Sequence, residues 1–334
     1  MKIKAHAALT AKSSLTPFEY EVGELGNEEV EVKVSHCGIC HSDLAMIDND
    51  FHFSSYPLVP GHEVIGTIDA VGNGVSKKIK IGQRVGIGWY ANSCSSCDWC
   101  TIGKENLCIK AQPTIAGRHG GFAEKIRCHW KFAVPIPDGL ASESAGPLMC
   151  AGSTVFAPIY EFGVRPWMRT AVVGIGGLGH LAVQFLAKMG CEVTAISSSH
   201  DKDAEIKKLG ASRFIATRGT NELAKAIGSF DFILSTVSAD IPWVDYIQAL
   251  RPQGRLVICG LPENEIHFPL FPLLAEKSVS GGINGSPSNN ATMLDFAARL
   301  GVKPLIELFP VQQINQALDH VRAGKARFRA VLEM

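Results

Sequence analysis

The sequence predicts an α/β protein that combines a mainly β domain with a domain built on a doubly wound parallel sheet. Polar and apolar residues alternate with the period of a strand in the first ~150 residues, and strand and helix patterns alternate from Thr170 onward. A chain of 334 residues also exceeds what one ordinary core encloses. We therefore expect two domains.

The mainly β domain is predicted from short alternating segments separated by glycine turns. Its strand-like segments are residues 28–36, 63–68 and 82–85. The last part of the chain, from about Pro287, is helical at 291–300 and strand-like at 329–332. We expect this C-terminal part to return to the first domain.

The second domain is predicted from βαβ wiring, in which short apolar strands alternate with helices. The strands are expected at 170–173, from 192, and at 214–215, 230–236 and 255–259; the helices are expected at 178–189, 204–209, 222–227 and 244–250. Parallel strands joined by helical crossovers form a sheet with helices on its faces.

Composition excludes several classes of function. Lys+Arg and Asp+Glu both total 32, so no net positive field attracts nucleic acid or an anionic membrane. No apolar run approaches the ~20 residues of a membrane helix, and residues 1–6 lack the apolar stretch of a signal peptide. We expect a cytoplasmic protein that binds neither nucleic acid nor membranes.

A glycine-rich turn predicts a dinucleotide site. Gly174, Gly176 and Gly179 have the G-x-G-x-x-G spacing between a predicted strand and helix, and Gly177 and Leu178 belong to the same turn. The first glycine permits the tight turn, the second lets a pyrophosphate approach the backbone, and the third lets helix and strand pack closely. This spacing also occurs for structural reasons, but its βαβ context favours dinucleotide binding.

The end of the second strand bears on the choice between NADP(H) and NAD(H). NAD-binding proteins usually place an acid there to hold the ribose diol. Here the chain has Ser197, Ser198 and Ser199, with Lys202 nearby, and these groups suit a 2′-phosphate. We therefore predict NADP(H). The alternative is a solvated turn in which Asp201 or Asp203 binds the diol.

Four of the ten cysteines predict a closed zinc site. Cys94, Cys97, Cys100 and Cys108 lie in one loop, so a short segment can surround one ion with four thiolates. A four-thiolate shell has no open position, and the ion is expected to be structural. The alternative is four thiols without a metal.

A second, dispersed set is compatible with a catalytic zinc. Cys40, His62 and Cys150 would offer two sulfurs and one imidazole, and would leave one position for water or substrate. Taken singly, each is more often a core cysteine or a hydrogen-bonded histidine. Their grouping depends on a family resemblance.

The motifs that carry the resemblance span nearly the whole chain. They are Gly-Ile-Cys40-His-Ser-Asp-Leu, Pro-Gly-His62-Glu63, the four-cysteine loop, Pro-Leu-Met-Cys150-Ala-Gly and the glycine turn at Gly174. Together they resemble the zinc-dependent medium-chain alcohol dehydrogenases. Within them, the chain is most similar to the cinnamyl-alcohol-dehydrogenase-like branch and its bacterial NADPH-dependent aldehyde reductases. The resemblance implies a GroES-like catalytic domain at 1–151 and 286–334, a Rossmann domain at 152–285, and an active site in the cleft.

The resemblance also assigns roles to individual residues. It implies Cys40, His62 and Cys150 as ligands of the catalytic zinc, with Glu63 as a nearby or alternate ligand. Asp43 would orient His62, and Ser42 would relay the proton. The further cofactor contacts that it implies are His41, Thr154, Thr236, Val237, Gly282, Ile283 and Asn284. The implied substrate pocket comprises Ser42, Phe51, Trp89, Tyr90 and Ile283.

One departure concerns the outer proton relay. Many relatives have a histidine five residues after the first zinc cysteine, whereas this chain has Ala45. Water or His52 are the candidate substitutes.

The sequence therefore predicts an oxidoreductase that binds two Zn²⁺ per chain and transfers a hydride between NADP(H) and an aldehyde or alcohol. From resemblance alone we expect a homodimer. The alternatives are a zinc-independent quinone-type reductase, a zinc-ribbon nucleic-acid binder and a redox sensor without enzymatic activity. The presence of the dispersed zinc ligands disfavours the first and third, and the balanced charge disfavours the second.

Overall fold

The computed structural model describes residues 1–201, 203–262 and 264–334, and it divides into two compact units. The first unit comprises Met1–Ser153 and Gly285–Met334, and the second comprises Thr154–Asn284. The chain thus crosses between the units twice. The sequence predicts boundaries after residue 151 and before residue 286. The observed boundaries differ from these by two residues and by one residue, respectively.

The first unit is built on a seven-stranded sheet. The strand order is β16-β17-β3-β4-β5-β9, and β8 also pairs with β3. The strands are β3 (Glu29–Ile39), β4 (Glu63–Val71), β5 (Arg84–Ile87), β8 (Lys125–His129), β9 (Val134–Pro135), β16 (Ile306–Pro310) and β17 (Arg329–Glu333). Two small two-stranded sheets accompany it: β1 (Lys2–Ala7) with β2 (Thr16–Glu21), and β6 (Tyr90–Asn92) with β7 (Gln112–Pro113).

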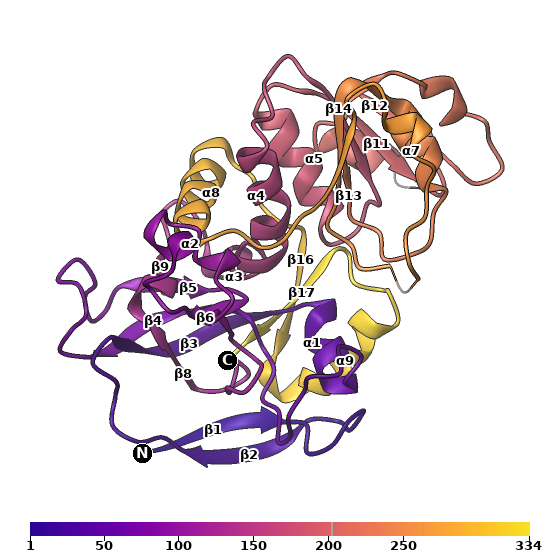
Figure 1. Cartoon of the computed structure of the whole chain (residues 1–334). Coiled ribbons are helices and arrows are strands. Elements are labelled where there is room, and N and C mark those ends of the chain that lie inside the picture. Colours follow the sequence, from indigo (N-terminus) through magenta and orange to yellow (C-terminus); the bar gives the residue numbers. More distant parts are fainter. Residues whose placement is uncertain (202, 263) are drawn as a thin grey trace. The chain divides into compact units, whose positions relative to one another are not determined.

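The end of the chain returns to this sheet, as the apolar pattern of its last residues predicts. β17 pairs antiparallel with β3, with Val331 opposite Gly38. Figure 1 shows β16 and β17, in yellow, beside the violet β3. Buried side chains such as Val32 and Leu332 belong to one core, so this pairing is supported by shared apolar burial.

Five helices belong entirely to the described part of the first unit. They are α1 (His41–Asp48), α2 (Asp98–Thr101), α3 (Ser142–Pro147), α8 (Pro287–Leu300) and α9 (Ile314–Arg322). α8 has clear end signals: Ser286 and Asn289 form a capping box at its start, and Gly301 ends it with φ of 71°. A wide π-helical turn, Leu148–Gly152, joins α3 to α4 (Ser153–Glu161), and it contains Cys150.

The second unit contains a six-stranded parallel sheet in the order β12-β11-β10-β13-β14-β15. Its strands are β10 (Arg169–Val173), β11 (Glu192–Ser197), β12 (Arg213–Ala216), β13 (Phe230–Ser235), β14 (Leu250–Ile258) and β15 (Ser278–Gly281). Its helices are α4 from Thr154 onward, α5 (Gly179–Lys188), α6 (Asp203–Lys208) and α7 (Trp243–Ala249). From β10 the chain adds β11 and β12 on one side of the sheet and then β13, β14 and β15 on the other. This is the doubly wound arrangement that the sequence predicts.

The predicted helix at 222–227 is wrong. The structure has only a 3₁₀ turn at Ala224–Ala226. The Thr220 hydroxyl donates to the Ala216 carbonyl, and the Glu222 carboxylate accepts from the Ala216 N–H at 2.9 Å. These local side-chain bonds occupy backbone groups at the end of β12 and compete with helix formation.

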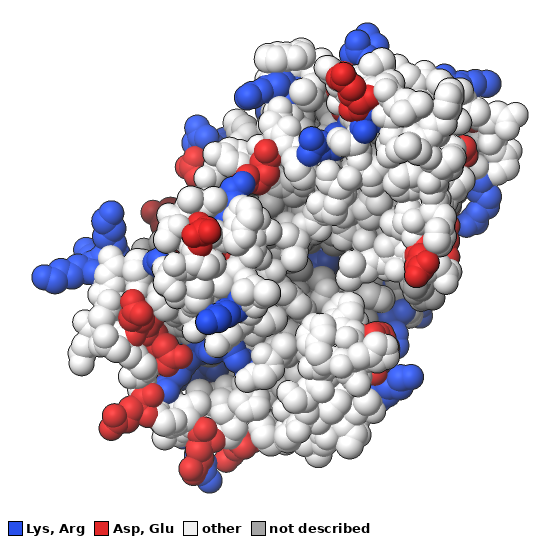
Figure 2. Space-filling view, viewed as in Figure 1, with Lys and Arg blue, Asp and Glu red and all other residues white. Residues whose placement is uncertain are grey.

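Charge is mixed over the surface. Figure 2 shows lysines and arginines interspersed with aspartates and glutamates on the visible face, in agreement with the equal totals of 32. Within the residues that the structure describes, no helix combines the length and apolar character needed to cross a membrane.

Candidate active site and metal centres

Asp43 organises the dispersed metal-binding set in the first unit. Its carboxylate is fully buried and accepts three N–H groups: those of the Cys40 backbone at 2.9 Å, the Gly61 backbone at 2.9 Å and His62 Nδ1 at 2.8 Å. The bond from Nδ1 assigns the ring proton to that nitrogen and leaves Nε2 as the ligand atom. Asp43 therefore joins the start of α1 to the loop before β4.

Three ligand atoms converge opposite Asp43. His62 Nε2 lies 3.2 Å from Cys150 Sγ, and Cys40 Sγ lies 3.8 Å from Cys150 Sγ. Two thiolates on a tetrahedral zinc are separated by roughly 3.8 Å, given bonds of about 2.3 Å. With Glu63, these donors all lie within 4.8 Å of one another, so the residues fit a zinc ion.

The electrostatics of this set differ from one donor to the next. The hydrogen bond with Cys150 lowers the pKa of Cys40, whereas the same bond and burial raise the pKa of Cys150. A thiol that coordinates zinc loses its proton. Burial lowers the pKa of His62, but the charge and hydrogen bond of Asp43 outweigh it and raise the pKa.

Arg329 is a site residue that sequence reasoning missed. It lies on β17, is 5% exposed, and its guanidinium pairs with Glu63 Oε1 and donates to the Ile39 carbonyl at 3.2 Å. Burial raises the pKa of Glu63 to about 7, and the positive charge of Arg329 opposes this rise. The available signal was an arginine at the start of an apolar strand, because a buried charge requires a partner.

The second metal-binding set lies in the loop that contains α2. Cys94 Sγ is 3.9 Å from Cys100 Sγ and 3.5 Å from Cys108 Sγ, and Cys97 completes the group within 4.8 Å. Backbone N–H groups of Ser96 and Cys97 lower the pKa of Cys94 to about 6, so the loop itself stabilises a thiolate. These four sulfurs fit a closed zinc site.

The glycine turn of the second unit fits a dinucleotide. Gly174 has φ of +84°, and a Cβ at Gly179 would lie 1.9 Å from the Gly174 carbonyl oxygen. A Cβ at Gly176 would meet open space, so the backbone is accessible there to a phosphate. His180 Nδ1 lies 2.9 Å from the Gly176 carbonyl and holds the turn, a contact that the spacing alone did not predict.

The predicted 2′-phosphate residues lie at the carboxyl end of β11. Ser197 is its last residue, and Ser198 and Ser199 follow it. Ser199 Oγ donates to Asp201 at 2.8 Å, while Asp203 pairs with Lys207 at 3.0 Å. Lys202 lies outside the described residues.

The comparisons with known proteins agree with this geometry. Residues 26–138 match the alcohol dehydrogenase GroES-like domain, and residues 177–299 match the zinc-binding dehydrogenase family. An aldehyde reductase of Synechocystis is 48% identical over 99% of this chain and 98% of its own length. The chain belongs to the zinc-binding alcohol dehydrogenases. This confirms the predicted family and the combination of a GroES-like domain with a Rossmann-type sheet.

Two solved structures place this alcohol dehydrogenase near the cinnamyl alcohol dehydrogenases. One of these enzymes, from Sorghum bicolor, matches with a TM-score of 0.95 and 35% identity over 100% of this chain and 98% of that one. The CAD of Helicobacter pylori, solved with NADP(H), matches with a TM-score of 0.90 and 28% identity over the same shares of the two chains.

Within the Rossmann-type unit of this alcohol dehydrogenase, the other predicted cofactor residues cluster beyond the strand ends. Thr236 Oγ1 donates to the Gly174 carbonyl at 2.7 Å, and Val237 follows it after β13. Asn284 Nδ2 donates to Thr154 Oγ1 at 2.9 Å. Gly282 and Ile283 follow β15, and Ile283 is 47% exposed.

The remaining predicted residues belong to the GroES-like unit. His41 is the first residue of α1 and is exposed, and Ser42 Oγ lies 3.9 Å from Cys40 Sγ. The Trp89 ring meets the edge of His62 at 5.0 Å between centroids. Phe51 stacks on Phe53 with 5.7 Å between the ring centroids, and among the described residues it has no ring contact with His62. Burial raises the pKa of Tyr90. Among the predicted pocket residues that the structure describes, Trp89 therefore contacts His62, and Ser42 contacts Cys40.

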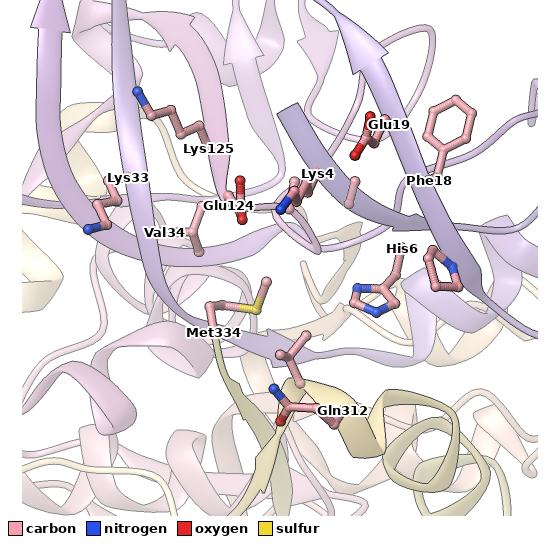
Figure 3. A pocket seen from close by; sticks show the side chains of 14 residues that line it. Lys4, His6, Phe18, Glu19, Lys33, Val34, Glu124, Lys125, Gln312 and Met334 are labelled. Atoms are coloured by element: carbon pink, nitrogen blue, oxygen red, sulfur yellow. The ribbon is translucent and has the colours of Figure 1, made fainter. Parts of the chain in front are cut away.

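A cavity of about 780 Å³ lies elsewhere in this unit, beside the β1–β2 hairpin. Figure 3 shows Lys4, Lys33 and Lys125 around it, together with Glu19 and Glu124. The described residues that line it include no predicted zinc, cofactor or substrate residue. Its lining therefore carries charges of both signs.

Proposed function

We propose that this alcohol dehydrogenase acts as an aldehyde reductase, which uses NADPH to convert an aldehyde into a primary alcohol. The observation that carries the proposal is the set Cys40, His62 and Cys150, whose imidazole is oriented by Asp43. Arg329 pairs with Oε1 of Glu63, and we take Cys40, His62 and Cys150 as the three zinc donors, with the fourth position open to a substrate oxygen.

When bound, zinc supplies an electrophile for the carbonyl oxygen, and NADPH supplies the hydride for the carbonyl carbon. The chain's own residues orient these groups and move the proton. Asp43 keeps Nε2 of His62 directed at the sulfurs. Ser42 Oγ, beside Cys40, donates the proton that completes the alcohol and regains one from solvent. The overall change is aldehyde plus NADPH plus H⁺ to alcohol plus NADP⁺.

NADP(H) is proposed because hydroxyl groups occupy the end of β11. Ser197, Ser198 and Ser199 offer donors, while Asp203, one possible ligand of a ribose diol, is paired with Lys207. Asp201 accepts a bond from Ser199 and is the group that opposes this assignment. The Helicobacter pylori CAD was solved with NADP(H), which further supports the choice.

The test is a panel of aldehydes, quinones, NADPH and NADH, followed by the absorbance of the reduced nicotinamide. We expect aldehyde-dependent oxidation of NADPH that a zinc chelator abolishes, and a kcat/KM at least tenfold lower with NADH. Reduction of quinones but not aldehydes, undiminished by complete removal of zinc, would support the zinc-independent reductase instead.

We also propose that the enzyme is a homodimer joined at the edge of the Rossmann-type sheet. In the described chain β15 pairs only with β14, and the neighbouring residues Leu270, Phe271 and Leu274 are 70%, 81% and 65% exposed. A second copy would pair the strand and cover these side chains. We expect Phe271→Asp to produce monomers in light scattering; a monomeric parent would contradict the proposal. A cytoplasmic location stays a prediction.

A further inference from the structure

The serines that follow β11 require a cation if they are to bind a phosphate group well. Hydroxyl groups donate hydrogen bonds but do not neutralise a phosphate, and the strongest phosphate sites add a guanidinium or ammonium. Phosphate binding by these serines therefore depends on which of the described cations lie near Ser198.

The strand register places Arg218 next to these serines. β11 and β12 are parallel, with Ser197 opposite Ala216. The pairing continues beyond both strands, because the Thr217 N–H donates to the Ser197 carbonyl at 2.9 Å and the Arg218 N–H donates to the Ser198 carbonyl at 3.1 Å. The backbone of Arg218 is therefore hydrogen-bonded to the backbone of Ser198, at the carboxyl edge of the sheet.

The side chain of Arg218 is exposed, and it makes no hydrogen bond or ion pair with the residues that the structure describes. The nearby residues His200 and Glu222 already interact with each other. His200 lies 3.5 Å from Glu222, whose other carboxylate oxygen accepts the Ala216 N–H. Nearby acids therefore do not hold the guanidinium, and it is available for a ligand.

We propose that Arg218 binds the 2′-phosphate of NADP(H), together with the hydroxyl group of Ser198, while the Ser199 hydroxyl stays bonded to Asp201; the inference rests on the proposed NADP(H) dependence. The planar guanidinium presents paired N–H groups that match two phosphate oxygens. Arg218 is consequently a specificity-determining residue, because NAD(H) lacks the group that it binds.

The test measures binding of cofactor fragments without turnover. Calorimetry would compare adenosine 2′,5′-bisphosphate with adenosine 5′-monophosphate, which differ by the 2′-phosphate alone, in the parent, Arg218→Ala and Arg218→Lys. The matched control is Arg213→Ala, because Arg213 is exposed at the opposite end of the same strand. Melting temperatures confirm that each variant is folded.

We expect Arg218→Ala to bind the bisphosphate about ten- to a hundredfold more weakly, with unchanged affinity for the monophosphate. Arg218→Lys should recover part of the loss, Arg213→Ala should bind like the parent, and added salt should reduce the difference. Parental bisphosphate affinity in Arg218→Ala would overturn this inference alone. A parent that binds both fragments equally would overturn both this inference and the proposed NADP(H) preference.

Discussion

The two metal-binding sets of the GroES-like unit use the same kind of ligand in opposite ways. The closed set lies within residues 94–108, and its own loop backbone stabilises the Cys94 thiolate. In the open set, Cys40 and Cys150 are 110 residues apart, and the imidazole between them depends on Asp43. A local set can hold an ion wherever its loop folds, whereas a dispersed set forms only when the tertiary structure is correct. The closed set therefore suits a structural zinc ion, and the open set suits a catalytic one.

The largest effect is expected from Cys40→Ser, which removes a ligand of the open set. Turnover should fall to background, because the site loses a thiolate donor and its affinity for zinc. Melting temperature should change by only a few degrees, since the closed set is untouched. The control is Cys128→Ser, the same change at a buried thiol outside both sets. Full activity of Cys40→Ser would remove catalysis from the open set.

Ser42→Ala tests whether the open set includes a proton donor. Positioned proton transfer contributes typically 10²- to 10⁴-fold, and we expect kcat to fall within that range while cofactor affinity is retained. Single-turnover measurements report the chemical step directly. Ser42→Thr retains a hydroxyl and should restore much of the rate. An unchanged chemical rate in Ser42→Ala would exclude this serine from the relay.

Asp43→Asn asks how much of the open set depends on its supporting carboxylate. An amide cannot accept all three N–H groups that Asp43 accepts, so the orientation of His62 should loosen. Losing such support typically costs 10- to 100-fold in metal affinity or activity. Competition with a zinc chelator measures the affinity. Parental zinc affinity and kcat together would show that the fold alone positions His62.

The spacing of the ligands along the chain determines how well the sequence predicts each of the two metal-binding sets. The four-cysteine loop is recognisable because its ligands are neighbours, and the glycine turn is recognisable because a strand precedes it and a helix follows. Cys40, His62 and Cys150 could be grouped only through family resemblance, since no local pattern brings them together.

Features that depend on distant pairing or local competition were not predictable. Arg329 reaches Glu63 only because β17 pairs with β3, and nothing near Arg329 in the sequence specifies that partner. The expected helix at 222–227 failed because Thr220 and Glu222 bond to the backbone of Ala216. The proximity of Arg218 to Ser198 likewise follows from strand register and not from spacing.

The smallest effect on chemistry is expected from Cys97→Ser, which opens the closed set. Zinc binding at such a loop contributes to folding, so the melting temperature should fall by at least about 5 °C. The kcat of the folded protein, measured well below that temperature, should stay within about twofold of the parent because the open set is intact. Thermal unfolding with and without chelator measures the first effect. A large loss of kcat with unchanged stability would reverse the roles assigned to the two sets.

Zinc content per chain is the most direct test of separate structural and catalytic sites. Metal analysis of the purified parent, Cys40→Ser and Cys97→Ser, with kcat measured on the same samples, counts the ions and links each to its role. We predict two zinc ions in the parent and about one in each variant, with turnover lost only in Cys40→Ser. One ion in the parent, or two ions and full turnover in Cys40→Ser, would contradict the account.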